Sequence, residues 1–239
     1  MHSWQRGPGA KWIGIRVPNA WAKGLLVAWL SGCCSLSLAA EEIRVVRKLE
    51  FGTQEPPTAT HRFELRLSVA VLRGAGWEPE AVGASVRRAV ALLAPCDVGT
   101  PKIQLFEIEA PARYRTLLTP VSRRLAAELD LPRPAVFFVA DTRQRPAFDA
   151  EAIGRGNSRT RPEMADTVWI VRGARDLEIA IAHELVHVLA DSGEHADAPG
   201  NLMNEDTSPG ATRLTEAQCS AMTEKALANG LLRRRNPPR

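Results

Sequence analysis

The first 40 residues of this 239-residue chain contain no aspartate or glutamate. An apolar stretch over residues 24–40 ends in small residues, just before Glu41 and Glu42. It is too short, and too rich in serine and glycine, to favour a membrane-spanning helix. The charged residues before it are all basic: Arg6, Lys11, Arg16 and Lys23. A basic start, an apolar middle and a small-residue exit are typical of a secretory signal peptide, which we predict over residues 1–40.

Two cleavage sites fit the end of this leader. The small residues at 37–40 suit ordinary signal-peptidase cleavage. Residues 30–33, which read Leu-Ser-Gly-Cys, instead resemble a bacterial lipobox, in which Cys33 becomes a lipid-bearing N-terminus. Apolar sequence continues past Cys33 and favours the ordinary cut, and an uncleaved anchor is the least favoured reading. In each case we expect an exported protein, periplasmic or secreted, that meets a membrane only through its signal or a lipid anchor.

No excess of positive charge remains once this leader is set aside. The chain has 31 Lys+Arg and 27 Asp+Glu, so removal of four basic residues leaves 27 of each. A neutral body lacks the electrostatic footprint of a nucleic-acid-binding protein, and we expect no nucleic-acid partner. The basic cluster at 233–235, together with Arg239, is predicted to be a solvated, frayed chain end.

Cysteine is scarce beyond the leader, where only Cys96 and Cys219 remain. No neighbouring cysteine or histidine completes a ligand pair, which argues against a zinc site built on these two. In an oxidising compartment the pair favours a disulfide that ties a C-terminal helix to the body, with two separate buried thiols as the alternative. Residues 41–239 are long enough for a real core and are predicted to form one domain.

Apolar patterns divide this domain into alternating strands and helices. Strands are predicted at residues 43–49, 61–72, 102–109, 135–140 and 167–171. Helices are predicted at residues 77–93, 113–129 (with a break near Pro120), 175–190 and 215–231. Residues 143–165 are rich in Arg, Gly and Pro and are expected to be a long irregular segment. This order predicts an α+β fold, with helices packed on a mixed sheet.

The helix expected at 175–190 contains the sequence His183-Glu184-Leu185-Val186-His187. Positions i and i+4 lie on one helix face, one turn apart. Two imidazoles so placed can bind one metal ion, with Glu184 beside it to handle a proton. The flanking residues are apolar, which fits a buried active-site helix. The alternative is a core or solvated helix that holds two histidines by coincidence.

Histidine is also scarce, and its distribution is uneven. Three of the five histidines lie within 13 residues, at positions 183, 187 and 195, and Gly-Asn-Leu-Met follows at 200–203. This arrangement resembles the metzincin clan of zinc peptidases, whose HExxHxxGxxH pattern precedes a methionine-containing turn. The resemblance implies one Zn²⁺ per chain, held by His183, His187 and His195, with Met203 in a turn that supports these ligands. It also implies a metzincin-like mixed sheet with an active-site helix and a C-terminal helix. Plain core packing is the alternative role for Met203.

The spacing departs from the clan's pattern. Seven residues separate His187 from His195, and the usual position of the third ligand holds Gly193, which cannot bind a metal. A helix that runs about half a turn longer and ends at Ser192-Gly193 would return His195 to the metal, because glycine permits a positive φ. The competing third ligands are Asp191, Glu194 and Asp197.

The resemblance implies a zinc metallopeptidase acting on a peptide or protein. In such an enzyme zinc lowers the pKa of a water molecule and polarises the scissile carbonyl. Glu184 would act as the general base and pass the proton to the leaving amine. We therefore expect a zinc-dependent hydrolase, with metalloendopeptidase as the favoured activity. The only tyrosine, Tyr114, lies far upstream of Met203, so the residue that stabilises the oxyanion stays unnamed.

Two alternatives compete with catalysis. One is a non-catalytic metal-binding envelope protein, whose closed zinc site would take a fourth protein ligand such as Asp191 or Glu194. The other is a structural protein that binds no metal.

Overall fold

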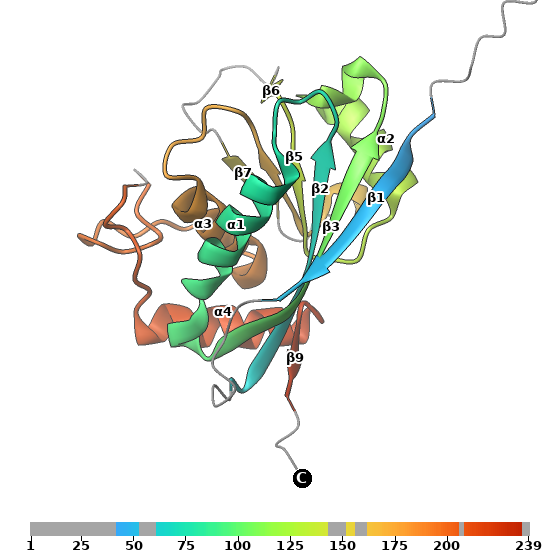
Figure 1. Ribbon diagram of the computed structural model, residues 1–239. Helices are drawn as coiled ribbons and strands as arrows, with labels where there is room; N and C mark the ends of the chain where they lie inside the picture. Colours follow the sequence, from blue (N-terminus) through green and yellow to red (C-terminus); the bar gives the residue numbers. More distant parts are fainter. Residues whose placement is uncertain (1–41, 53–60, 143–151, 156–161, 206–207, 236–239) are drawn as a thin grey trace, which may run out of the picture. The chain divides into compact units, whose positions relative to one another are not determined.

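A mixed β-sheet lies at the centre of the computed structural model (Figure 1). The structure describes residues 42–52, 61–142, 152–155, 162–205 and 208–235, which lie in one compact unit. The strand order is β1-β3-β2-β5-β8-β7, and β9 also pairs with β2. The strands are β1 (Arg44–Phe51), β2 (Phe63–Leu72), β3 (Val98–Glu109), β5 (Ala135–Phe138), β7 (Ala152–Arg155), β8 (Thr167–Ile170) and β9 (Leu232–Arg234). A separate pair joins β4 (Thr116–Leu117) and β6 (Asp141–Thr142).

The centre of the sheet is parallel and its periphery antiparallel. β3, β2, β5 and β8 run parallel to one another. β1, β7 and β9 pair antiparallel with β3, β8 and β2. Strands buried on both faces favour apolar residues throughout, which explains the apolar sequence of β5 and of β8 after its first residue, Thr167. The predicted α+β fold with a mixed sheet is confirmed.

Helices cover both faces of the sheet (Figure 1). On one face lie α1 (Pro79–Ala91), α3 (Leu177–Ala190) and α4 (Glu216–Ala228), which share a core with Leu65, Leu67 and Val69 of β2. On the other lies α2 (Thr119–Leu129), which shares a second core with Ala70 and Leu72. Alternate residues of β2 therefore serve two cores. Within the described part of the chain, no helix is both long and apolar enough to span a bilayer.

The prediction of one helix over 113–129 is wrong in its first part. The 3₁₀ helix η2 (Ala112–Arg115) and β4 precede α2, which begins at Thr119. Pro120 lies in the first turn of α2, where its missing N–H costs nothing. The expected break near Pro120 is thus the true start of the helix.

Two other expectations also need correction. Residues 143–165 were expected to be irregular, but β7 lies within them, paired with β8, and the 3₁₀ helix η3 (Pro162–Met164) follows. The basic tail was expected to be frayed, but α4 ends at Ala228 and Leu232–Arg234 pair with Phe63–Leu65 as β9. Backbone hydrogen bonds fix this segment whatever charge its side chains carry. Arg239 and the leader with Cys33 lie outside the described residues, so the signal peptide and lipidation stay predictions.

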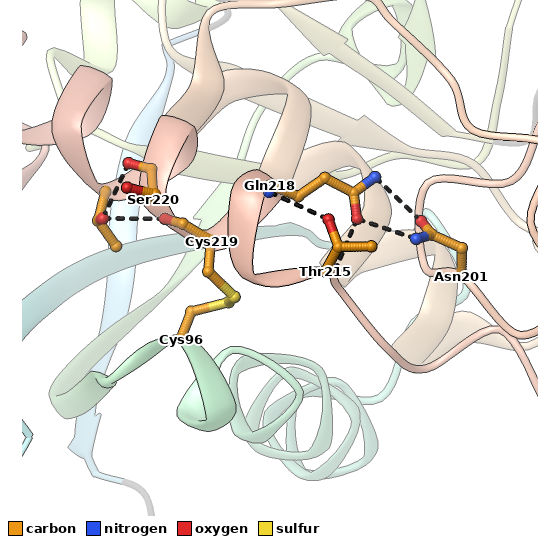
Figure 2. The surroundings of a disulfide bond; sticks show 7 residues. Cys96, Asn201, Thr215, Gln218, Cys219 and Ser220 are labelled. Carbon is orange, nitrogen blue, oxygen red and sulfur yellow. Dashed lines mark hydrogen bonds between the residues drawn. A yellow bond between two sulfur atoms is a disulfide. The ribbon is translucent and has the colours of Figure 1, made fainter.

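The disulfide expected between Cys96 and Cys219 is confirmed (Figure 2). It joins the 3₁₀ helix η1 (Ala94–Cys96), which follows α1, to α4, and its Cα atoms lie 5.0 Å apart. The two cysteines are 123 residues apart in sequence, so the bond closes a long loop. Closing such a loop stabilises a fold by about 2–4 kcal/mol, mainly by restricting the unfolded chain. The C-terminal helix is thereby fixed to the body of the protein.

Candidate metal centre

The helix α3 carries the first two histidines of the site. Nine of its 14 residues are buried, because it packs between α1, α4 and the sheet. His183 is only 4% exposed, whereas His187, one turn later, is half-buried. The imidazole rings of the two residues have centroids 4.6 Å apart. The i, i+4 spacing therefore places both rings on one helix face, as the sequence predicts.

The third histidine reaches the other two through an early end of α3. The helix ends at Ala190, and Asp191 takes a left-handed conformation with φ of 49°. The Ser192 N–H then donates to the His187 carbonyl. The prediction of a longer helix broken at Ser192-Gly193 is wrong, because aspartate also tolerates the left-handed region and makes the turn two residues earlier. His195, in the exposed loop that follows, is brought to the other histidines.

The three imidazoles converge through their Nε2 atoms. The His187 Nε2 atom lies 2.9 Å from that of His183 and 3.2 Å from that of His195. Candidate ligand atoms of these residues all lie within 4.8 Å of one another, and no other Cys, Asp, Glu or His of the described residues joins the group. Tetrahedral zinc with bonds of 2.0–2.1 Å separates its nitrogen ligands by about 3.3 Å. The histidine cluster therefore has the dimensions of a zinc site.

Backbone carbonyls fix the tautomers of two of these rings. His183 donates its Nδ1–H to the Leu202 carbonyl at 2.7 Å, and His187 donates its Nδ1–H to the Ser192 carbonyl at 2.7 Å. A carbonyl can only accept, so the proton of each neutral ring is on Nδ1 and its Nε2 carries a lone pair. This second hydrogen bond is the usual way in which a metal-binding histidine is oriented.

Electrostatics keep these two rings neutral. Burial lowers the pKa of His183, although the bond to Leu202 opposes the shift. Burial, helped by the neighbouring His183, lowers the pKa of His187 to about 4. Both imidazoles are then neutral at pH 7 and point lone pairs at each other across 2.9 Å. Two such nitrogens cannot hydrogen-bond, whereas a metal cation between them would satisfy both.

The turn expected around Met203 holds two of the histidine-bearing segments. Its Leu202 carbonyl accepts from His183, and its Met203 carbonyl accepts from the N–H of Ala196, the residue after His195. Met203 is 4% exposed and belongs to the core that also contains the buried residues of α3. In this packing position the side chain fills space, and the backbone of the turn contacts the ligand segments.

Two amide side chains join this turn to α4 (Figure 2). Asn201 donates to the Gln218 Oε1 atom at 2.9 Å, and Gln218 donates to the Asn201 Oδ1 atom at 3.2 Å. Gln218 also accepts from the N–H of Thr215 and completes the capping box of α4. The turn is therefore tied to the start of the last helix.

The competing ligands lie outside the histidine cluster. Asp191 caps α3 and forms an ion pair with Lys225 of α4 at 3.7 Å. Glu194 and Asp197 are exposed loop residues and do not belong to the group.

Glu184 follows His183 on α3 and is half-buried. Tyr114 packs in the core on the α2 face of the sheet, away from the helix that carries the histidines.

Sequence reasoning missed Asn201, Gln218 and the two carbonyls that orient the rings. The Thr215–Gln218 spacing is a readable capping box, but nothing in it names Asn201 as a partner. The carbonyls carry no sequence signal, because every residue has one.

A class of site is therefore defined: three histidines, two on an HExxH helix and one in the loop that follows it, arranged to bind one metal ion. No protein-family model matches the sequence, and no curated protein matches it. Among solved structures, the chain is similar to the crystal structure of metalloproteinase-II from Bacteroides fragilis, with 14% sequence identity and a TM-score of 0.49. The match covers 73% of this chain and 56% of that chain, so this chain spans little more than half its length.

Proposed function

We propose that the protein is a zinc-dependent hydrolase, and that it acts as a metalloendopeptidase. The observation that carries the proposal is the convergence of three Nε2 atoms, two of them held as lone-pair donors by backbone carbonyls. Neutral imidazoles suit zinc, and three of them leave a fourth position for water or substrate. His183, His187 and His195 would hold the metal.

The chemistry divides between the metal and Glu184. His183, His187 and His195 would hold a zinc ion, which would supply Lewis-acid chemistry for a carbonyl and a water molecule. Glu184 follows His183 on α3 and is half-buried. As general base it takes a proton from the attacking water and gives it to the leaving amine.

An exchangeable fourth position on the metal would distinguish the proposed enzyme from the non-catalytic alternative. A closed structural zinc site needs four protein ligands. The group in the described residues has three, and Asp191, one of the two competing fourth ligands, is paired with Lys225. These observations favour an exchangeable fourth position.

We further propose that the protein is exported and acts on a peptide or protein outside the cytoplasm. The leader over residues 1–40 motivates this, and the Cys96–Cys219 disulfide supports it, because structural disulfides persist in oxidising compartments.

The test compares zinc content and hydrolysis in matched variants. We expect one zinc per chain in the natively purified protein, and cleavage of denatured casein that a chelator stops and added zinc restores. Glu184→Gln should keep zinc and lose at least about 100-fold in rate, as expected for a general base. His195→Ala should lose zinc, whereas Glu194→Gln, an exposed neighbour, should change neither property.

Three results would contradict the proposal. Full activity in Glu184→Gln would remove the general base. A zinc-loaded structure with four protein ligands would favour the non-catalytic binding protein. Absence of zinc after purification without chelators, together with failure to take up added zinc, would favour a structural protein.

A further inference from the structure

The segment Asn201–Met203 controls the placement of two histidines. The Leu202 carbonyl receives the Nδ1–H of His183, and the Met203 carbonyl receives the N–H that follows His195. A movement of this segment would therefore move two of the three converging nitrogens together. The contacts that hold Asn201–Met203 in place therefore also affect the geometry of the histidine cluster.

A single buried side chain organises the segment from within. Asn201 is 5% exposed, and its Oδ1 atom accepts from the N–H of Met203 at 2.8 Å. The same oxygen accepts from Gln218 at 3.2 Å, and the Asn201 amide nitrogen donates back to Gln218 at 2.9 Å. Because the Met203 N–H needs an acceptor, Asn201 can take only this amide orientation.

The partner amide is equally constrained. The Gln218 Oε1 atom accepts from the N–H of Thr215 at 2.8 Å, so its amide nitrogen must face Asn201. Gln218 belongs to the first turn of α4, whose next residue, Cys219, is bonded to Cys96. Asn201 is therefore paired with a side chain of α4 whose next residue along the helix is bonded to the body of the fold by the disulfide (Figure 2).

We propose that Asn201 and Gln218 are positioning residues of the metal centre, which hold the Leu202 and Met203 carbonyls where His183 and the loop of His195 need them. This inference rests on the metal centre of the proposed function. Residues that orient metal ligands through hydrogen bonds change metal affinity about 10–100-fold when they are replaced. Asn201 and Gln218 act one bond further out, and the lower end of this range applies to them.

The capping box allows the positioning role to be separated from helix stability. In Gln218→Glu a carboxylate oxygen still accepts from the N–H of Thr215, so the cap is kept. The donor to Asn201 is lost, and a carboxylate oxygen then faces the Asn201 carbonyl oxygen. Thr215→Ala does the opposite: it removes the hydroxyl that accepts from the Gln218 N–H and leaves the amide pair intact.

The experiment measures zinc affinity, by competition with a chromophoric chelator, and the Tm of the metal-free protein, in the full disulfide-bonded chain. We expect Gln218→Glu to weaken zinc binding about tenfold and to lower the Tm by no more than Thr215→Ala does, although two oxygens then face each other. We expect Thr215→Ala to lower the Tm by about 2–4 °C, with zinc affinity unchanged. The visible spectrum of the cobalt-substituted protein should change in Gln218→Glu and not in Thr215→Ala.

The opposite pattern overturns the inference. Equal zinc affinity and an identical cobalt spectrum in Gln218→Glu would show that the amide pair does not position the ligands. A loss of affinity that follows the Tm in both variants would show a purely structural role. A wild type that binds no zinc would overturn this inference and the proposed function together, whereas zinc binding without hydrolysis would overturn the proposed enzyme alone.

Discussion

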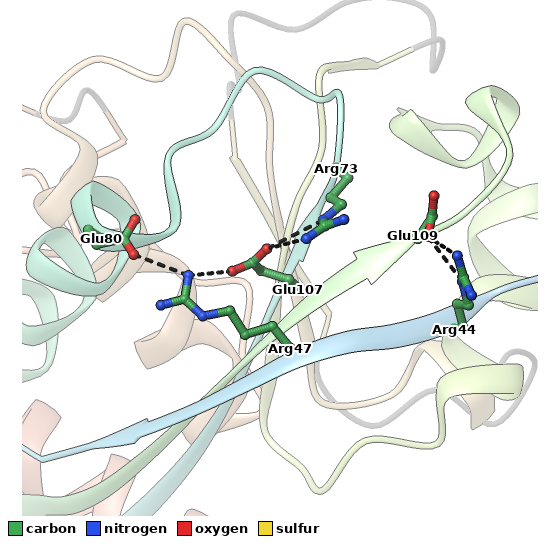
Figure 3. A network of polar contacts seen from close by, with 6 residues as sticks. All are labelled: Arg44, Arg47, Arg73, Glu80, Glu107 and Glu109. Atoms are coloured by element: carbon green, nitrogen blue, oxygen red, sulfur yellow. Dashed lines mark hydrogen bonds and ion pairs between the residues drawn. The ribbon is translucent and has the colours of Figure 1, made fainter.

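Two polar clusters in this protein differ in how their buried polar atoms are paired. Around Glu107 of β3, which is 6% exposed, the partners carry opposite charge: Arg47 lies 2.9 Å away and Arg73 lies 3.4 Å away (Figure 3). Arg47 also reaches Glu80 at the start of α1. In the histidine cluster, by contrast, nitrogen lone pairs face each other across 2.9 Å.

The difference separates a structural network from a binding site. In the Glu107 network the carboxylate oxygens accept hydrogen bonds from the arginine side chains. The bond to Glu107 also raises the pKa of Arg47. The histidine cluster satisfies its outer nitrogens with carbonyls and leaves its inner nitrogens opposed. Burying polar atoms without partners costs free energy, so such an arrangement indicates a ligand that compensates for it. The pattern of partners is therefore more informative than the number of buried polar groups.

The largest expected effect is the stabilisation of the protein by zinc. A ligand at 1,000 times its Kd stabilises the folded state by about 4 kcal/mol, which corresponds to about 8–16 °C in Tm for a chain of this size. His187→Ala should abolish this shift, because it removes the nitrogen that lies between the other two. Thermal unfolding with zinc and with a chelator measures it. Glu107→Gln is the control and should keep the full shift from a lower starting Tm; a zinc-induced shift retained in His187→Ala would place the metal elsewhere.

A smaller effect is expected in the charge network. Glu107→Gln leaves Arg47 and Arg73 facing a neutral amide. Breaking a fully buried pair costs about 3–5 kcal/mol, but these arginines are about half exposed, so we expect a loss of about 1–2 kcal/mol. Urea unfolding measures the change.

A neighbour on the same strand supplies the matched control. Glu109 pairs with Arg44 at 2.5 Å, but both side chains are largely exposed, so Glu109→Gln should cost less than about 1 kcal/mol. Equal losses in the two variants would mean that burial does not distinguish the pairs. Neither variant should change zinc affinity, because neither residue contacts the histidine cluster.

The parts of the fold and site that the sequence predicted are those governed by local pattern. Alternating and continuous apolar runs predicted the central strands, and the HExxH spacing placed two rings on one helix face. The third histidine followed from the scarcity of histidine and from the resemblance to metzincins. The α+β architecture followed from the order of the elements.

The features of the fold and site that the sequence did not predict depend mainly on contacts between segments far apart in the chain. β9 exists because the tail meets β2, and a basic sequence does not show this. Asn201 and Gln218 are 17 residues apart and pair only once α4 has packed against the turn. Asp191 ended α3 two residues before the glycine that the sequence favoured, because aspartate can also adopt a positive φ. Tertiary contacts override local preference at these points.

The smallest expected effect concerns Asp166, whose pairing is intermediate between that of the Glu107 network and that of the histidine cluster. Its Oδ1 atom is buried and has no hydrogen-bond partner among the described residues. Burial raises the pKa of Asp166, and the nearby Arg133 opposes the shift. The ionised carboxylate is therefore less favourable in the folded state than in the unfolded chain, and this costs stability at pH 7. That cost disappears as the pH falls through the raised pKa towards the unfolded value near 3.9.

Asp166→Asn should therefore be slightly more stable than the wild type at pH 7, by less than about 0.5 kcal/mol after screening of a half-exposed residue. Asparagine also tolerates the positive φ of 55° at this position. The difference should shrink as the pH is lowered from 7 to 4 in urea unfolding. Asp130→Asn is the matched control, because Asp130 also has a positive φ and lies near Arg133 but is exposed. A variant that is less stable than the wild type at pH 7 would show that Arg133 compensates for the burial of Asp166. Asp166 would then be part of a paired charge network like that of Glu107.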